Sequence, residues 1–99
     1  MNKVLVIAGT VDAKQIIDRL LKMDLEVSAT VTTRLGNELL NYSEDIKIYE
    51  GRITKQRIAN LVEELNPVCV IDASNPFAIE ISQNVINACT INNVPYLRF

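Results

Sequence analysis

The sequence predicts an α/β fold built on a parallel, doubly wound sheet of five strands. Short apolar runs of strand type alternate with segments of helical periodicity throughout the 99 residues. The run at residues 3–8 (KVLVIA) is continuously apolar after its lysine, as expected for a strand covered on both faces. Strands that alternate with helices are joined by right-handed crossovers, which leave consecutive strands parallel. We therefore expect one domain with helices on both faces of the sheet.

The first half of the chain shows three strand patterns separated by two helical ones. Across residues 12–23 apolar side chains recur every three or four positions, which predicts an amphipathic helix. Asp12 followed by Gln15 is the pair expected to cap its first turn. The other predicted elements of this half are a strand at 25–31, a short helix at 35–41 and a strand at 46–49.

The second half contains the clearest amphipathic helix, over residues 54–65, which Asn66-Pro67 ends. Pro76 is expected at the first position of the last helix, with Ser74 or Asn75 as its cap, because proline has no N–H to satisfy there. The other predicted elements are a strand at 68–72, a helix at 76–92 and a strand at 94–99.

The composition excludes several classes of function. A formal net charge of -2 provides no basic field for nucleic acid. No apolar run approaches the roughly 20 residues that span a bilayer, and the start lacks a signal peptide. The chain has no histidine, so the commonest metal ligand and general base is missing and no metal site is expected. Cys69 and Cys89 are unclustered, which is typical of core residues in a reduced, cytoplasmic protein.

The loop after the first strand is a candidate phosphate site. All loops that follow strands reach the same border of a parallel sheet, where ligands bind in open α/β folds. Gly9 allows close approach of the backbone, and the Thr10 hydroxyl with the following helix N-terminus suits a phosphate. The turn lacks the three glycines of the dinucleotide fingerprint, so a plain structural turn remains an open alternative.

The loop after the second strand indicates NADP. NAD-binding sheets carry an acidic residue here for the ribose 2′-hydroxyl, whereas an arginine suits a 2′-phosphate. This chain has no acid at that point and has Arg34 preceded by Thr32 and Thr33. A solvated loop arginine is the alternative interpretation.

Gly51 and Arg52 close the third strand, where an adenine usually lies. Gly51 permits close approach, and Arg52 can stack on a ring or meet an anion. The alternative is a turn glycine beside a surface charge.

The polar turn after the fourth strand is the most informative segment. Asp72 follows four apolar residues, and Ser74 and Asn75 add hydrogen-bonding groups. Asp72 is interpreted either as a ligand-facing carboxylate or as a group that stabilises the turn. Phe77 is interpreted either as an apolar wall for a flat ligand or as a core residue.

Four segments, in order, resemble the precorrin-6A reductase (cobalt-precorrin-6A reductase) family. Residues 8–13 (AGTVDA) are similar to its Gly-Gly-Thr-x-Glu-Ala turn, and 51–54 (GRIT) to its Gly-Arg-Leu segment. Residues 72–78 (DASNPFA) resemble its specific signature, Asp-Ala-Thr-His-Pro-Phe-Ala, and 94–98 (VPYLR) its Val-Pro-x-x-Arg strand. Asn75 replaces the signature histidine, so a proton-transfer role at that position is not carried over.

The resemblance implies a Rossmann-like domain of an oxidoreductase of cobalamin (corrin) biosynthesis. Such enzymes transfer a hydride from NADPH or NADH to the macrocycle of the tetrapyrrole precorrin-6A or cobalt-precorrin-6A. The resemblance does not indicate which residue of this chain would act as the catalytic acid. The resemblance implies that Gly9 and Thr10 contact the cofactor phosphates, and that Thr32, Thr33 and Arg34 contact its 2′-phosphate end. Gly51 and Arg52 would flank the adenosine, and Arg52 or Arg98 would pair with substrate carboxylates. The nicotinamide and the macrocycle would lie against Asp72, Ser74, Asn75 and Phe77.

Family members are longer and have a second α/β domain, so the 99 residues correspond to an N-terminal domain that is expected to be inactive alone. The chain stops on a strand, and Val94, Tyr96 and Leu97 are expected to leave apolar surface for that second domain or for self-association. A dinucleotide site requires the strand order 3-2-1-4-5, which we favour over 2-1-3-4-5. The rival interpretation is a non-catalytic nucleotide-binding or protein-interaction domain of the same design.

Overall fold

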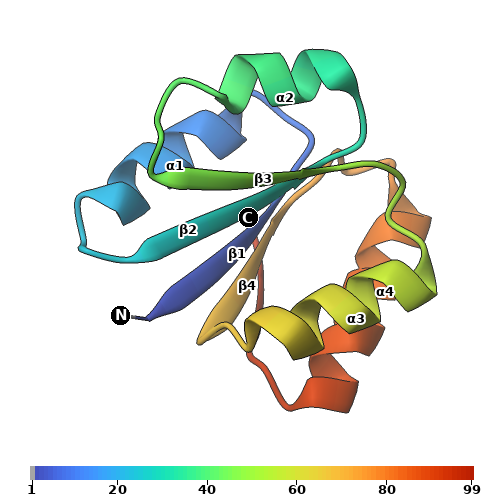
Figure 1. Cartoon of the computed structure of the whole chain (residues 1–99). Coiled ribbons are helices and arrows are strands. Elements are labelled where there is room, and N and C mark those ends of the chain that lie inside the picture. The colour runs from blue at the N-terminus through green and yellow to red at the C-terminus, as the bar shows by residue number, and fades with distance from the viewer. Residues whose placement is uncertain (1) are drawn as a thin grey trace.

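The computed structural model describes residues 2–99 and confirms the predicted α/β architecture (Figure 1). All five strands are parallel, and their order is β3-β2-β1-β4-β5, as the dinucleotide interpretation requires. The elements are β1 (Lys3–Ala8), α1 (Asp12–Leu21), β2 (Glu26–Val31), α2 (Arg34–Leu40), β3 (Ile46–Glu50), α3 (Lys55–Leu65), β4 (Cys69–Ala73), α4 (Ile79–Asn92) and β5 (Tyr96–Arg98).

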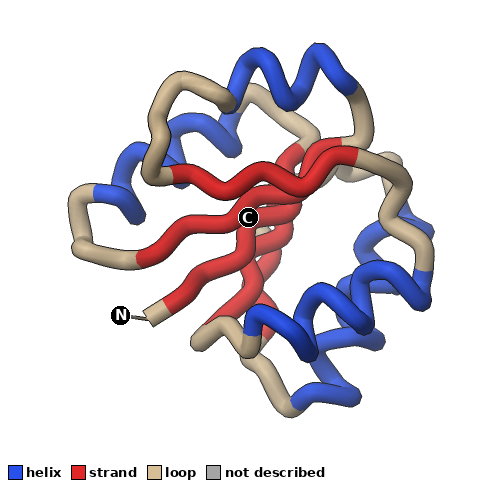
Figure 2. The backbone as a smooth tube through the Cα atoms, viewed as in Figure 1, coloured by secondary structure: helices blue, strands red, loops and turns tan. Residues whose placement is uncertain are grey.

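Helices cover both faces of the sheet, as Figure 2 shows, with α1 and α2 on one face and α3 and α4 on the other. The alternation of strand side chains divides the central strand β1 between the two cores. Val4 and Val6 pack on the α1 side, whereas Leu5 and Ile7 pack on the α3 and α4 side. Complete burial of such a side chain stabilises the fold by about 1.5–3 kcal/mol, so β1 is central to folding as well as to topology.

Helix α1 begins at Asp12 as predicted, but its predicted cap was wrong, as were the predicted start and cap of α4. The cap of α1 is Val11, which is already in a right-handed helical conformation and makes no side-chain bond, so Asp12 lies inside the helix and does not cap it. Helix α4 begins at Ile79 and not at Pro76. The Asn75 side chain accepts the Phe77 N–H at 2.9 Å, and the Asn75 carbonyl accepts the Ala78 N–H at 2.9 Å. These local bonds form a separate turn that competes with helix formation.

Strand β5, at one edge of the sheet, leaves less apolar surface exposed than predicted. Val94 is buried, and Tyr96 is half-buried on the α4 side. Leu97 points to the other face, where it is 55% exposed next to Phe99, which is 67% exposed. Leu97 and Phe99 therefore leave open apolar surface on the face that carries α1. No helix within residues 2–99 is long and apolar enough to cross a membrane.

The end of α4 gives a test of backbone conformation. Asn93 has φ 56° in the left-handed region, and its N–H bonds to carbonyls of the last helical turn. Asn93→Ala should lower the free energy of unfolding by about 1 kcal/mol, because a Cβ without a local polar group disfavours this region, whereas Asn93→Gly should not destabilise. Urea titrations measure both. Equal destabilisation by alanine and glycine would show that the asparagine side chain, and not φ, is what matters.

Candidate functional site

A groove of about 530 Å³ lies where β1 and β2 end. It brings together four of the predicted residues from two separate loops. These are Gly9, Thr10, Thr32 and Thr33. Apolar side chains that are otherwise exposed, Val11, Leu35 and Leu39, line it as well. The groove therefore combines a polar turn with an apolar wall, as small-molecule sites commonly do.

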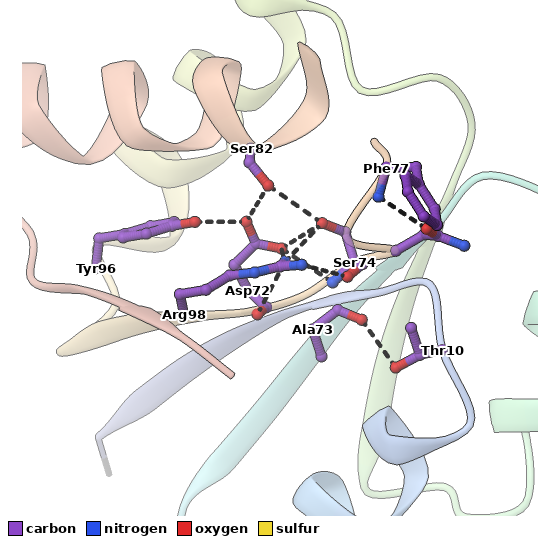
Figure 3. A network of polar contacts seen from close by, with 9 residues as sticks. Thr10, Asp72, Ala73, Ser74, Phe77, Ser82, Tyr96 and Arg98 are labelled. Carbon is purple, nitrogen blue, oxygen red and sulfur yellow. Dashed lines mark hydrogen bonds and ion pairs between the residues drawn. The ribbon is translucent and has the colours of Figure 1, made fainter. Parts of the chain in front are cut away.

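The turn after β1 packs directly against the turn after β4. A Cβ on Gly9 would lie 3.0 Å from Ser74 Cα and 3.1 Å from the Asn75 nitrogen, so only glycine fits without displacement. Thr10 Oγ1 donates to the Ala73 carbonyl at 3.1 Å (Figure 3). The Thr10 hydroxyl hydrogen is thus used within the protein, and the predicted donation from that hydroxyl to a phosphate does not match this geometry.

The loop after β2 contributes its threonines to the groove but not its arginine. Thr33 caps α2 by accepting the Gly36 N–H at 3.0 Å. The side chain of Arg34 is 88% exposed, does not line the groove, and lies 3.9 Å from the carboxylate of Glu38. The cation that does line the groove is Lys14 of α1, whose Nζ lies 5.0 Å from the ring centre of Tyr42. Sequence reasoning missed Lys14 because it belongs to the polar stripe of an ordinary amphipathic helix.

Gly51 and Arg52 lie outside the groove, beyond β3. Gly51 has φ 138°, and its N–H donates to the Val31 carbonyl at 2.9 Å. The Arg57 guanidinium covers this turn, donating to the carbonyls of Glu50 at 2.7 Å and Arg52 at 3.4 Å. The cavity beneath is only about 10 Å³ and cannot hold a nucleobase. Arg52 itself is exposed.

The carboxylate of Asp72 is the centre of a polar network at the end of β4 (Figure 3). The side chain is fully buried, and Oδ1 accepts from Ser74 N at 3.0 Å, Ser74 Oγ at 2.6 Å and Arg98 Nη1 at 2.9 Å. Oδ2 accepts from Ser82 Oγ at 2.7 Å and from the Tyr96 hydroxyl at 2.6 Å. Asp72 therefore stabilises the turn. A carboxylate buried in this way cannot also face a ligand, so the alternative interpretation does not fit.

The electrostatics of the network follow from these contacts. Burial alone would raise the pKa of Asp72, but hydrogen bonds from Ser74, Tyr96 and Ser82 outweigh it and leave that pKa below its ordinary value. Burial and the neighbouring carboxylate raise the pKa of Tyr96 to about 12, so the phenol remains a donor at neutral pH. The network is thus an ionised carboxylate surrounded by protonated donors.

The remaining predicted residues of this turn differ in their accessibility. Ser74 is buried, whereas Asn75 is exposed. Phe77 is 91% exposed, so the core interpretation of this ring was wrong and the ring projects from the rim. Arg98 uses its guanidinium on Asp72 and Ser74, which does not favour the predicted contact with a substrate carboxylate. Sequence reasoning missed Ser82 and Tyr96, since single hydroxyls on a helix and a strand carry no pattern.

Comparison with known proteins identifies the family. The family described as precorrin-6x reductase CbiJ/CobK matches the chain over residues 3–99. The chain belongs to this family. The resemblance seen in the sequence is thereby confirmed. The Asp72 network and the Gly9 turn coincide with three of the four segments that resemble precorrin-6A reductases, residues 8–13, 72–78 and 94–98.

Individual relatives agree with this membership. The cobalt-precorrin-6A reductase of Methanothermobacter thermautotrophicus is 37% identical over 97 residues, covering 97% of this chain and 32% of that protein. The cobalt-precorrin-6A reductase of Priestia megaterium is 35% identical over 96 residues, covering 97% of this chain and 37% of that protein. The chain thus spans about a third of the length of the curated relatives it matches.

Solved structures share the fold. A CobK precorrin-6A reductase superposes with a TM-score of 0.83 at 24% identity, covering 100% of this chain and 39% of that one. The Bordetella bronchiseptica enzyme WbmG, solved in complex with NAD, gives a TM-score of 0.81 at 17% identity over 98% of this chain and 36% of that one. These likenesses establish the Rossmann-like fold of this member of the precorrin-6x reductase family.

The Asp72 network predicts a pH-dependent stability. Because the pKa of Asp72 is lowered by folding, its contribution is complete above the unfolded pKa of about 3.9 and is lost as pH falls through the folded pKa. Asp72→Asn should cost about 3 kcal/mol at pH 7, since it removes one partner of a buried ion pair. Urea unfolding at several pH values measures the gap between wild type and variant. A gap that stays constant from pH 7 to below pH 3 would contradict this assignment.

Gly51 gives a second test. Gly51→Ala should lower the free energy of unfolding by about 2 kcal/mol or more, because a Cβ would lie 1.8 Å from Arg57 Nη1 and φ 138° disfavours L residues. Introducing the change into an Arg57→Ala background removes the clash and leaves the backbone strain, so the cost should shrink without vanishing. An unchanged cost in that background, measured by urea titration, would rule out the clash with Arg57.

Proposed function

We propose that this chain is the dinucleotide-binding domain of a precorrin-6A or cobalt-precorrin-6A reductase of cobalamin biosynthesis, using NADPH or NADH. The observation that carries the proposal is the groove beside Gly9 and Thr33 at the carboxyl ends of β1 and β2, in a chain of a reductase family. The NAD complex of WbmG supports it, because that protein uses the same fold to hold a nicotinamide dinucleotide. Two unpaired cysteines, Cys69 and Cys89, agree with a reducing, cytoplasmic location.

The groove fits a dinucleotide by size and by chemistry. About 530 Å³ is within the range of small-molecule sites. The pyrophosphate would lie at the turn of Gly9 and Thr10, where helix α1 begins and backbone N–H groups face outward. Thr10 would contribute its backbone and not its hydroxyl, which is bonded to Ala73. The apolar wall formed by Val11, Leu35 and Leu39 would pack against the adenosine.

The charge at the ribose end determines the choice between NADPH and NADH. Thr32 and Thr33 line the groove there, and the chain carries no acid in this loop to repel a 2′-phosphate. Lys14 from α1 and Arg34 from α2 are the cations on either side, and both would approach a 2′-phosphate. We therefore favour NADPH, with Lys14 as a contact in addition to the sequence-predicted Arg34.

The nicotinamide end would lie toward the turn after β4. Bound NAD(P)H would supply a hydride to a carbon of the tetrapyrrole macrocycle. The protein's contribution is to hold the reactants and exclude water. Asn75 would face the cofactor, while buried Ser74 would hold the turn from within and the exposed ring of Phe77 would form an apolar wall for the flat macrocycle. Asn75 does not titrate, so we assign it hydrogen bonding and not proton transfer.

The substrate side is incomplete in these 99 residues. Arg52 is exposed at the border and is the candidate for pairing with a substrate carboxylate. The curated relatives are about three times as long, which leaves room for a second domain that would form the opposite wall of the cleft. The open face at Leu97 and Phe99 is where that further part, or a second copy, would pack. The 99-residue chain alone is expected to bind weakly and to lack activity.

A titration of the full-length protein tests the cofactor assignment. Lys14→Gln and Arg34→Ala should each raise the Kd for NADPH by about fivefold and leave that for NADH unchanged, because a lost charged contact costs about 1 kcal/mol. Fluorescence of the reduced nicotinamide, or calorimetry, measures the Kd of each cofactor for the wild type and for each variant. Arg19→Ala, a charge removed elsewhere on α1, is the matched control and should change neither constant.

Two results would count against this proposal. Equal effects of Lys14→Gln on NADPH and NADH would exclude its contact with the 2′-phosphate. Failure of the wild-type protein to bind either dinucleotide would favour the rival interpretation, a protein-interaction domain of the same fold.

A further inference from the structure

We propose that Arg98 is a positioning residue that turns the Ser74–Asn75 peptide, so that the Asn75 N–H is presented to the groove beside Gly9. The orientation of the peptide is inferred from contacts within the chain. That this N–H donates a hydrogen bond to an oxygen of a bound dinucleotide rests on the proposed function. The residue that carries the role belongs to the last strand, far in sequence from the turn that it orients.

The guanidinium of Arg98 donates hydrogen bonds to two oxygens of Ser74 (Figure 3). Nη2 donates to the Ser74 carbonyl oxygen at 2.9 Å, and Nη1 donates to Ser74 Oγ at 3.0 Å. Nη1 also forms the ion pair with Asp72 Oδ1 at 2.9 Å, which fixes the position of the fork. Only a planar guanidinium presents several donors in this fixed arrangement, so a lysine cannot reproduce it.

The direction of the carbonyl determines the direction of the next N–H. In a planar trans peptide the C=O and N–H bonds point in opposite directions. Because the Ser74 carbonyl points to Arg98, the Asn75 N–H points away from β5 and toward the turn after β1. Gly9 lies on that side, since a Cβ on Gly9 would be only 3.1 Å from the Asn75 nitrogen.

The Asn75 N–H is an unused donor on an exposed residue. Within residues 2–99 it donates to no acceptor, although the neighbouring N–H groups of Ser74 and Phe77 are both bonded. Asn75 is exposed, and Gly9 lines the groove. Because position 9 is a glycine, its backbone packs beside the Asn75 nitrogen and no side chain from that position covers the N–H. An N–H with no protein partner at the rim of the groove suits an anionic or carbonyl oxygen of the cofactor.

Arg98→Lys in the full-length, 15N-labelled protein tests this inference. The lysine keeps a positive charge beside Asp72 but loses the bond to the Ser74 carbonyl. We expect the residual dipolar coupling of the Asn75 N–H to change in the free protein, and the Kd for NADPH to rise about tenfold. Tyr96→Phe is the matched control, because it also removes one donor to Asp72 from the same strand but leaves Ser74 untouched. It should bind NADPH within about twofold of wild type.

The outcomes separate this inference from the proposed function. An unchanged Asn75 coupling together with unchanged NADPH affinity in Arg98→Lys overturns the positioning role. Absence of NADPH and NADH binding in wild type overturns the proposed function and the use of this N–H, while the coupling still decides whether Arg98 orients the peptide. If Arg98→Lys does not fold, the wild-type protein decides: the Asn75 amide resonance should shift on addition of NADPH, and a stationary resonance overturns the inference.

Discussion

A buried carboxylate needs a complete set of donors, and Asp72 obtains its set from three separate elements of the fold. The donors come from the turn after β4, from α4 through Ser82, and from β5 through Tyr96 and Arg98. Each partner offsets part of the cost of burying this charge. The border of the sheet at this end is therefore held by one ionised group and the hydrogen bonds that converge on it.

This constraint is transmitted to the groove through direct contacts. Asp72 fixes Ser74, and the backbone at Ser74 packs against Gly9, while Thr10 bonds to the carbonyl of Ala73. The turn after β1 is thus set by the turn after β4 and not only by its own sequence. Asp72 and Ser74, which the sequence offered as ligand contacts, are buried behind the turn and support it from within.

Much of the fold was predictable because it depends on periodicity. Continuous apolar runs such as 3–8 and the stripe of α3 indicate a parallel sheet with helices on both faces, and a dinucleotide site requires the observed strand order. The start of α4 was not predictable from Pro76, because it depends on bonds made by the Asn75 side chain and carbonyl. Pattern reasoning treats each residue's preference separately, whereas these bonds form a competing local structure.

The candidate site was predictable at the level of loops but not of single side chains. Gly9, Thr10, Thr32 and Thr33 do meet at one groove, since the topology brings their loops to one border. The inward direction of Asp72 and Arg98 could not be deduced, because it depends on donors supplied by Ser82 and Tyr96 at distant positions. Lys14 lines the groove although the sequence did not indicate it, and Arg34 does not line it, since side-chain direction depends on how α1 and α2 pack.

A crystal structure of the full-length protein with NADPH would show whether the groove beside Gly9 holds the cofactor. We expect density for the pyrophosphate beside Gly9 and Thr10, with the adenosine along the wall formed by α2. A second open groove, of about 430 Å³, lies at the far end of α4 beside Tyr96. Dinucleotide bound there, with the Gly9 groove empty, would show that the cofactor does not bind at the ends of β1 and β2.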